Sequence, residues 1–488
     1  MLIRHSFLYI AARIAPGLLG MGTTAILTRL LEPRSYGLYG LALVIMTFVS
    51  STGFDWLGVT FVRFNESRRD DERTAATFIL IFFILVGVSA VLAAAAWAAG
   101  AFSGAGAPIC LLGVLSAWSY SWFEFSARVE TSNMRPLRYL VMSFARAAFI
   151  MAGASTAAWL TRDPVWTTAG SALGMLAGGM FGSLRSNRVR LALFDRALAR
   201  TIVGFGLPLA ASMTLSTVVV SGVRLLIQVL DSSDALGLYT AAFVLVQSSL
   251  AILVSGVASA SYPLAVRAVE SGDPARAQRQ LLANGGLVLA VLAPACLGMA
   301  LTARGISTTL VGPRFSAGVA ALTPWMAAGT FFAGFRAHFL DHAFQLGRRP
   351  SLQIWVTCGA AVVAVALGFY LIPRDGPVGA AMAVTGAMLV GCIHAILVRR
   401  WAYPVPLPVK AAFQVGFCCL VMTAAVKALP DRHGAAAFLL QVLTGVVAYG
   451  LGGIAVDLLG SRRRLLQILA GGRPAALGRP VPVRSVDR

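Results

Sequence analysis

The sequence predicts an all-α, polytopic membrane protein of about 14 transmembrane helices: two pseudo-symmetric six-helix bundles and two C-terminal helices. Three observations indicate this class. Hydrophobic residues make up 58% of the 488 positions and charged residues only 12%, whereas a soluble domain carries about 25% charged residues. Apolar segments of about 20 residues, the length that crosses a bilayer, recur from end to end. Finally, a short motif returns after an offset of 200 residues.

The first observation, hydropathy, places the spans. Arg4 and His5 precede an apolar run that resembles a signal peptide, but Arg13 interrupts the run and no small-residue cleavage site follows, so we interpret it as a retained first span. The expected spans are approximately 7–31, 37–62, 74–99, 108–128, 139–160, 165–184, 204–230, 235–262, 281–302, 317–344, 351–372, 377–398, 410–429 and 434–459.

The distribution of positive charge supports this arrangement. With the N-terminus in the cytoplasm, 28 of the 40 Lys and Arg residues fall in cytoplasmic loops or termini and seven on the opposite side. Basic loops remain on the cytoplasmic side of membrane proteins, and a miscounted span would invert the bias further along the chain. We therefore expect both termini in the cytoplasm, at a bacterial inner membrane. Because the net charge of +21 is spread over short loops, it does not indicate nucleic-acid binding, which gathers charge on one solvated face.

The repeat predicts two halves with the same orientation. Tyr36-Gly37-Leu38-Tyr39 follows the first span and Leu236-Gly237-Leu238-Tyr239 follows the seventh, while Arg135-Pro136 is echoed by Arg349-Pro350. Six spans per repeat is an even number, so the halves should be related by an axis along the membrane normal, with a substrate path between them. The expected domains are 1–200 and 201–400 (the two bundles), 401–460 (two additional helices) and 461–488 (a basic cytoplasmic tail).

One glycine stripe indicates close helix packing. Span six carries a glycine at every fourth position, which lets a neighbouring helix approach closely. The stripe comprises Gly170, Gly174, Gly178 and Gly182.

Several enzyme classes are excluded or disfavoured. A phosphate-cradling Walker A loop needs Gly-Lys-Ser/Thr, and the two lysines, Lys410 and Lys427, each stand between Val and Ala. Loops shorter than about 20 residues leave no room for a soluble catalytic domain. His338, Asp341 and His342 suggest a zinc site on a helix, but the spacing departs from the protease motif and no third ligand is evident, so a polar stripe lining a cavity is preferred. We expect no catalytic residue, no metal and no cofactor.

Two stretches resemble a known family. Thr28 to Arg63 has an Arg-Leu-Leu helix end, Gly37-Leu38-Tyr39, an apolar span, and then Asp55 and Gly58; Phe205-Gly206-Leu207-Pro208 opens a second stretch that passes Arg224. In this order the motifs resemble those of the oligosaccharide flippases and polysaccharide transporters of the multidrug/oligosaccharidyl-lipid/polysaccharide superfamily.

That resemblance implies a function. Members of the family move lipid-linked sugar chains, usually on undecaprenyl pyrophosphate, across the cytoplasmic membrane by alternating access, feeding O-antigen, capsule or exopolysaccharide synthesis. The implied partners are a lipid-linked oligosaccharide, membrane lipids and the polysaccharide polymerase and export proteins. One departure is that Val223 stands beside Arg224, where relatives often carry an acidic residue.

Four arginines inside spans are candidates for binding the pyrophosphate and any acidic sugars. An arginine at mid-membrane costs about 2.5–3.5 kcal/mol on insertion scales, and guanidinium binds phosphate bidentately. The alternative is that each side chain extends to the membrane surface. The candidates are Arg13, Arg146, Arg224 and Arg336.

Three intramembrane acids are candidates for coupling to H⁺ or Na⁺: Asp55, Glu124 and Asp341. A buried carboxylate can titrate near neutral pH. The alternative for Glu124 is a structural pair with Arg128, four residues further along the helix.

Two prolines are candidates for helix bends at the binding site, Pro16 and Pro208. Proline removes one backbone hydrogen bond, and interrupted helices in both halves of a transporter point to its site. The alternative is a tolerated kink without function.

Two other functions remain open. A cation-coupled multidrug exporter of the same superfamily usually has twelve spans and acidic binding residues, and a non-transporting membrane scaffold would tolerate substitutions at Arg13 and Arg224.

Overall fold

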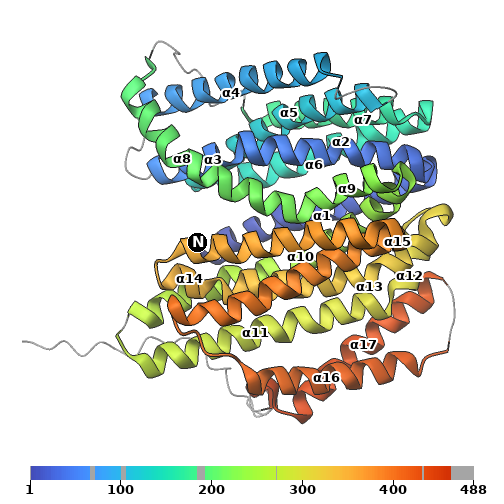
Figure 1. Cartoon of the computed structure of the whole chain (residues 1–488). Helices are drawn as coiled ribbons and strands as arrows, with labels where there is room; N and C mark the ends of the chain where they lie inside the picture. The colour runs from blue at the N-terminus through green and yellow to red at the C-terminus, as the bar shows by residue number, and fades with distance from the viewer. Residues whose placement is uncertain are drawn as a thin grey trace, which may run out of the picture.

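The computed structural model describes residues 2–65, 72–100, 106–183, 193–270, 272–430 and 434–462, with side chains described outside 2–11, 13, 65, 182–183, 251–263 and 350. Across these ranges the regular structure is helical and no strand is present. The long helices lie side by side and roughly parallel to one another (Figure 1). Most of the predicted basic tail, from residue 463 onward, falls outside the described residues.

Three helices of the first half begin at a proline. Pro33, Pro136 and Pro164 each open a helix, a position where the missing N–H has no helical partner to lose. The first-half helices are α1 (Leu2–Leu30), α2 (Pro33–Gly53), α3 (Asp55–Asn65), α4 (Glu72–Ala98), α5 (Ala107–Ser132), α6 (Pro136–Thr161) and α7 (Pro164–Ser183).

The second half follows the same plan with two π-helical segments. Its elements are α8 (Arg196–Thr217), η3 (Val218–Gly222), α9 (Val223–Leu230), α10 (Ser233–Glu270), α11 (Pro274–Leu301), α12 (Ala303–Leu310), α13 (Pro313–Phe335), η4 (Arg336–Leu340), α14 (His342–Leu346) and α15 (Pro350–Val398). Two more long helices follow, α16 (Val409–Lys427) and α17 (Ala435–Ala455).

The expected spans coincide with these helices. The second expected span is divided at Phe54, and the eleventh and twelfth form one element, α15, in which Gly376 has a non-helical backbone (φ 55°, ψ −135°). Within the described residues, nine helical segments are long and apolar enough to cross a membrane. The protein is therefore a multi-pass membrane protein, while the total of fourteen spans stays a prediction.

The glycine stripe packs α7 directly on α6, as predicted. A Cβ atom built on Gly170 would lie 2.4 Å from the Gly153 carbonyl oxygen, and one on Gly174 would lie 2.3 Å from the Phe149 carbonyl oxygen. A Cβ on Gly178 would lie 2.4 Å from Arg146 Cα. Glycine is thus required on this face because the two backbones touch.

The repeated motifs meet each other across a pseudo-two-fold axis. A Cβ on Gly37 would lie 1.7 Å from the carbonyl oxygen of Ser233, and a Cβ on Gly237 would lie 2.1 Å from that of Pro33. Since 33 and 233, like 37 and 237, differ by 200, the contact is reciprocal. Gly40 likewise faces Thr240. We call this contact the glycine crossing; it is the direct structural counterpart of the sequence repeat.

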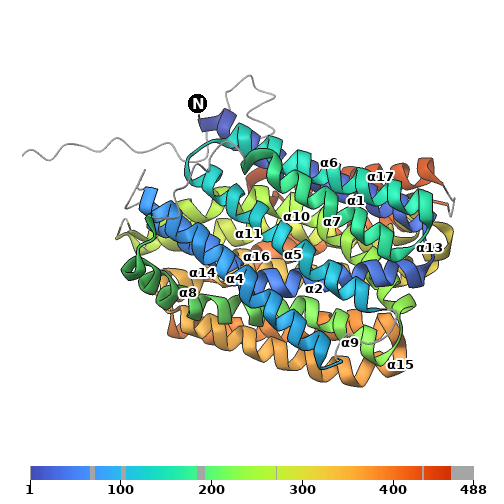
Figure 2. The same ribbon diagram turned by 90° about the horizontal axis from the view of Figure 1, so that it is seen from above.

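The helices form two groups. One contains α2 to α9 and the other α10 to α17, with α1 between them (Figure 1); Figure 2 shows the same groups from above. Helix α8 packs against α2 and α3, whereas α9 also packs against α15, so the seventh span lies in the first group and contacts the second group through α9. Helices α16 and α17 pair with each other and α16 packs against α11. The domain boundaries at 200 and 400 remain predictions.

The two ends of the bundle differ in charge. We call the end where α1 meets α2, α9 meets α10 and α12 meets α13 the arginine-poor end, to the right in Figure 1. The opposite end carries the basic loops.

Candidate functional site

Two of the predicted acids come together in the first half. Asp55 is the first residue of α3, directly after the break between α2 and α3. A carboxylate is favoured in the first turn of a helix because the free backbone N–H groups there carry partial positive charge. Asp55 interacts electrostatically with Arg128 and with Glu124, both on α5. The Glu124–Arg128 ion pair, which is the alternative for Glu124, is not present within 4 Å among the described residues.

Arg146 completes this cluster from α6. Its guanidinium carbon lies 4.3 Å from the centroid of the Phe123 ring and 5.5 Å from that of Tyr120. Tyr120 in turn hydrogen-bonds Glu124 and interacts electrostatically with Asp55. The Arg146 Nε is buried and has no hydrogen-bond partner among the described residues. We call Asp55, Tyr120, Glu124, Arg128 and Arg146 the first-half charge cluster; two carboxylates and two guanidinium groups share it.

Arg224 lies alone in the second half. Only 5% of the residue is exposed. Its Nη2 donates a 2.9 Å hydrogen bond to Ser221 Oγ, and its guanidinium carbon lies 4.5 Å from the centroid of the Phe243 ring. Its Nε has no partner, and no carboxylate lies within ion-pair distance of it in the described residues. A buried guanidinium without a counter-charge is energetically unfavourable unless a ligand or another group compensates it.

Arg336, by contrast, has a carboxylate nearby, although its Nε and Nη1 also lack hydrogen-bond partners among the described residues. Its Nε lies 3.9 Å from Asp341 Oδ2, and Gln353 Nε2 donates a 3.1 Å hydrogen bond to the same oxygen. Both charged residues lie at the ends of the π-helical segment η4. His338 and His342 lie on the same stretch, but no group of three or more potential metal ligands is found among the described residues.

Three predicted residues are placed only by their backbone. Arg13 lies on α1, with its side chain outside the described set. The helical backbone continues through Pro16 in α1 and through Pro208 in α8, so the bends stay predictions. Departures from α-helical geometry near the candidate arginines of the second half are η3, which ends two residues before Arg224, and η4, which begins at Arg336.

Sequence reasoning missed the aromatic partners and the π-helical segments. The spacing of four between Tyr120 and Glu124 could have indicated their contact. Nothing in the sequence near Arg224 indicates Phe243, which belongs to the next helix. Such π-helical segments occur frequently at functional sites, and the valine run before Ser221-Gly222 is at most a weak signal for one.

The halves are also joined at the arginine-poor end by polar contacts beside the glycine crossing. Arg29 Nη1 and Nη2 donate 2.9 Å hydrogen bonds to the carbonyl oxygens of Leu310 and Thr309 respectively. The Gly312 N–H donates a 3.1 Å hydrogen bond to Thr28 Oγ1, and Arg314 pairs with Glu32. The structure therefore has the two halves in direct contact at this end.

A large apolar cavity lies beside the bundles. Its volume is about 590 Å³, and residues of α1, α10, α11, α12, α16 and α17 line it. It extends from Met21 on α1 and Leu250 on α10 to Val446 on α17. Tyr449, at its edge, donates a 2.9 Å hydrogen bond to the Ala290 carbonyl oxygen, which ties α17 to α11.

Residues 26–320 match the family model described as polysaccharide biosynthesis protein. The chain belongs to this family. The matched region includes Asp55, Glu124, Arg146 and Arg224 and ends before Arg336 and Asp341. No curated protein sequence matches the chain significantly.

Solved structures show the fold of this family member to be that of known transporters. It is similar to the lipid II flippase MurJ in an inward closed conformation, with 13% identity, a TM-score of 0.77, and coverage of 94% of this chain and 100% of that chain. It is also similar to an inward-facing multidrug resistance MATE family transporter of the MOP superfamily, with 14% identity, a TM-score of 0.59, and coverage of 81% and 97%. A MOP superfamily transporter from Pyrococcus furiosus gives 12% identity, a TM-score of 0.54, and coverage of 82% and 94%.

Proposed function

We propose that this protein is a flippase that translocates a lipid-linked oligosaccharide, carried on undecaprenyl pyrophosphate, across the inner membrane for surface polysaccharide synthesis. Membership of the polysaccharide biosynthesis protein family and the MurJ-like fold support a lipid-linked substrate. The observation that carries the proposal is that one protein combines buried guanidinium groups, on α6 and α9, with a large apolar cavity lined by α1, α10, α11, α12, α16 and α17.

The pyrophosphate head group is negatively charged, and the buried arginines carry the opposite charge. Arg146 and Arg224 each keep a buried Nε without a hydrogen-bond partner in the described structure. Guanidinium presents several donors in a planar fork that matches phosphate oxygens. In this proposal Arg13 and Arg336 contribute further positive charge along the path.

The lipid tail requires apolar surroundings while the head group crosses. The cavity between the second half and α16–α17 supplies such surroundings. Because lipid is as apolar as the protein interior, burial against these helices adds little driving force. The cavity's role is therefore to let the tail accompany the head group along a mostly apolar surface.

In an alternating-access cycle, the glycine crossing would act as the closure on one side of the membrane. By the distribution of basic loops, the arginine-poor end faces away from the cytoplasm and both termini lie inside the cell. The glycine crossing then closes the outer side. Its opening, coupled to H⁺ or Na⁺ at Asp55, Glu124 or Asp341, would release the head group.

Deletion of the protein in its native host tests this function. Surface polysaccharide and cytoplasmic-side lipid-linked units are measured together, with the wild-type chain supplied in trans as the control. We expect polymer to be lost and full-length lipid-linked units to accumulate. Normal polysaccharide would contradict the proposal, as would loss of polymer without accumulated units.

A second candidate is a cation-coupled multidrug exporter, which the paired acids Asp55 and Glu124 favour. Normal polysaccharide with altered drug resistance in the same deletion strain would support it. A non-transporting scaffold is the remaining alternative, and unchanged polysaccharide levels in the Arg13→Ala and Arg224→Ala variants would support that role.

A further inference from the structure

A cavity in the second half stands where the first half has a closed contact. Tyr39 and Tyr239 correspond at the offset of 200, and Ser171 and Thr385 correspond at the offset of 214 that also relates Arg135-Pro136 to Arg349-Pro350. In the first half, Tyr39 Oη and Ser171 Oγ lie 3.4 Å apart. In the second half, Thr385 Oγ instead donates to the backbone carbonyl oxygens of Trp325 (2.7 Å) and Ala381 (2.8 Å).

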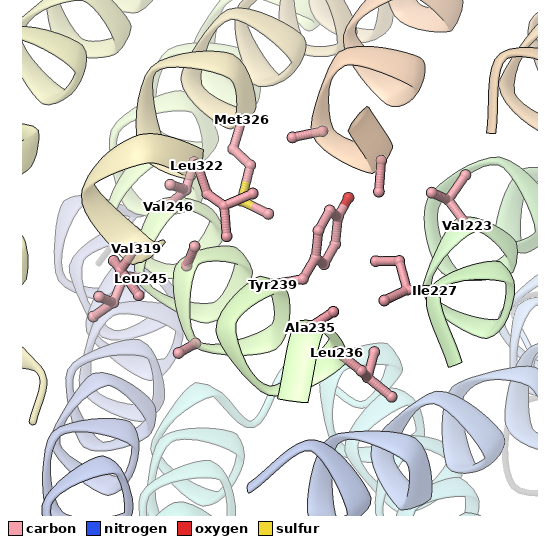
Figure 3. Packing of buried hydrophobic residues seen from close by; sticks show 14 of the residues in the cluster. Val223, Ile227, Ala235, Leu236, Tyr239, Leu245, Val246, Val319, Leu322 and Met326 are labelled. Atoms are coloured by element: carbon pink, nitrogen blue, oxygen red, sulfur yellow. The ribbon is translucent and has the colours of Figure 1, made fainter. Parts of the chain in front are cut away.

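Tyr239 is consequently left without a partner. The residue is only 2% exposed, and no hydrogen bond from its hydroxyl is found among the described residues. Its ring lies between Met326 on one side and Val223 on the other, with the hydroxyl directed away from its own helix (Figure 3). The hydroxyl does not belong to the fully buried atoms that lack a partner, because Tyr239 lines a cavity, and a species held in that cavity can hydrogen-bond it.

The cavity that Tyr239 lines is small and partly polar. Its volume is about 60 Å³, enough for one or two water-sized species, since a water occupies about 30 Å³ in the liquid. Gln247 adds an amide to the lining. Thr330 and Thr385 also line it, but their hydroxyl protons are donated to backbone carbonyl oxygens, so they can only accept.

The charge around the cavity favours an anion. No carboxylate lines it. The nearby Arg224 interacts electrostatically with Tyr239 and lies over Phe243, which is itself a lining residue. A cation in the cavity would be repelled by this uncompensated guanidinium, whereas an anion would supply its missing counter-charge.

We propose that this cavity binds one small inorganic anion of the size of chloride, hydrogen-bonded by the Tyr239 hydroxyl and the Gln247 amide. The anion compensates Arg224 and lies on the Tyr239 and Gln247 side of the cavity, away from the Thr330 and Thr385 oxygens, which can only accept. This site is separate from the first-half charge cluster, and it does not depend on the flippase proposal.

Crystals of the full-length protein grown in bromide test the site directly. We expect an anomalous bromide peak within hydrogen-bond distance of Tyr239 Oη, and no such peak in Tyr239→Phe. In solution, raising chloride at constant ionic strength against gluconate should raise the Tm of the wild type by about 2 °C or more.

The corresponding tyrosine of the first half supplies the matched control. Tyr39→Phe removes a hydroxyl that already contacts Ser171, so its Tm should fall equally with and without chloride, while Tyr239→Phe should lose the chloride response. Bromide absent from the wild-type cavity, or a Tm response to sodium against choline but not to chloride, would overturn the proposal. A chloride response that persists unchanged in Tyr239→Phe would also overturn it.

Discussion

The two halves share a backbone plan but fill it differently. Positions 24 and 36 of the first half correspond to positions 224 and 236 of the second. In the first half, Thr24 accepts a 3.2 Å hydrogen bond from Tyr36. The second half places Arg224 and Leu236 at these positions, and the arginine turns to Ser221 and Phe243 instead. The comparison teaches that the repeat preserves how the helices cross, whereas the buried polar side chains and their partners differ between the halves.

The same contrast holds for helix packing. In the first half, Gly170 and Gly174 bring α7 against the backbone of α6. The equivalents at the offset of 214 are Val384 and Met388, which line the small cavity of the second half. The bulkier side chains that replace glycine on this part of α15 line a cavity shared with η3, α10 and α13, where polar groups can hold a ligand.

The largest expected effect comes from breaking what the halves share, the glycine crossing. Gly237→Val places side-chain atoms against the Pro33 carbonyl oxygen, where there is no room even for Cβ. Overpacking of this kind disfavours the closed contact by about 1–3 kcal/mol, roughly a 5- to 150-fold shift towards separated halves. Spin labels at the exposed Arg34 and Arg304 should report a longer distance across the arginine-poor end.

The reciprocal glycine provides a second variant for this test, and another glycine of α2 provides the control. Gly37→Val should have an effect similar to that of Gly237→Val because the contact is reciprocal. Gly53→Val is the control, since it lies at the other end of α2 with nothing within 4 Å of its Cβ. An unchanged distance in both crossing variants, or an equal change in the control, would refute the crossing as the outer closure.

The next effect comes from converting one half into the other. Arg224→Thr with Leu236→Tyr gives the second half the polar pair of the first. If Arg224 binds the pyrophosphate, complementation of the deletion strain should fall about 10- to 100-fold, as expected for a lost charge-assisted hydrogen bond, and Leu236→Tyr alone controls for the volume added at this fully buried position. Full complementation at normal expression would remove Arg224 from the transport path.

A smaller effect distinguishes the acids of the two halves. Asp55→Asn removes one of two carboxylates from the first-half charge cluster and should reduce transport to the level seen without an ion gradient. Asp341→Asn leaves Arg336 without its counter-charge and should lower stability by about 1–3 kcal/mol, with the gradient dependence retained. Transport into vesicles with and without imposed H⁺ or Na⁺ gradients measures both. The opposite result would place coupling in the second half.

Much of the fold could be predicted from the sequence, because lipid imposes long apolar helices and the repeat fixes their order. The repeat predicts two halves of the same orientation, whereas the contact between Gly37 and Gly237 is seen only in the structure. The candidate site was harder to predict. Arg146 and Arg224 could be selected because arginine is unfavourable in a membrane, but their partners Phe123 and Phe243 are ordinary apolar residues in sequence. The η3 and η4 segments arise from tertiary packing and carry no strong local signal.

The smallest expected effect concerns the ion pair between Glu32 and Arg314, which also joins the halves at the arginine-poor end. Both side chains are about two-thirds exposed (69% and 66%), and exposed pairs contribute at most about 1 kcal/mol and are screened by salt. Glu32→Gln should therefore change the Arg34–Arg304 label distance little, and less still at high salt. If it opened the halves as far as Gly237→Val does, closure would be electrostatic. If the effects rank as expected, closure of the halves is steric and depends on the close backbone contact at Gly37 and Gly237.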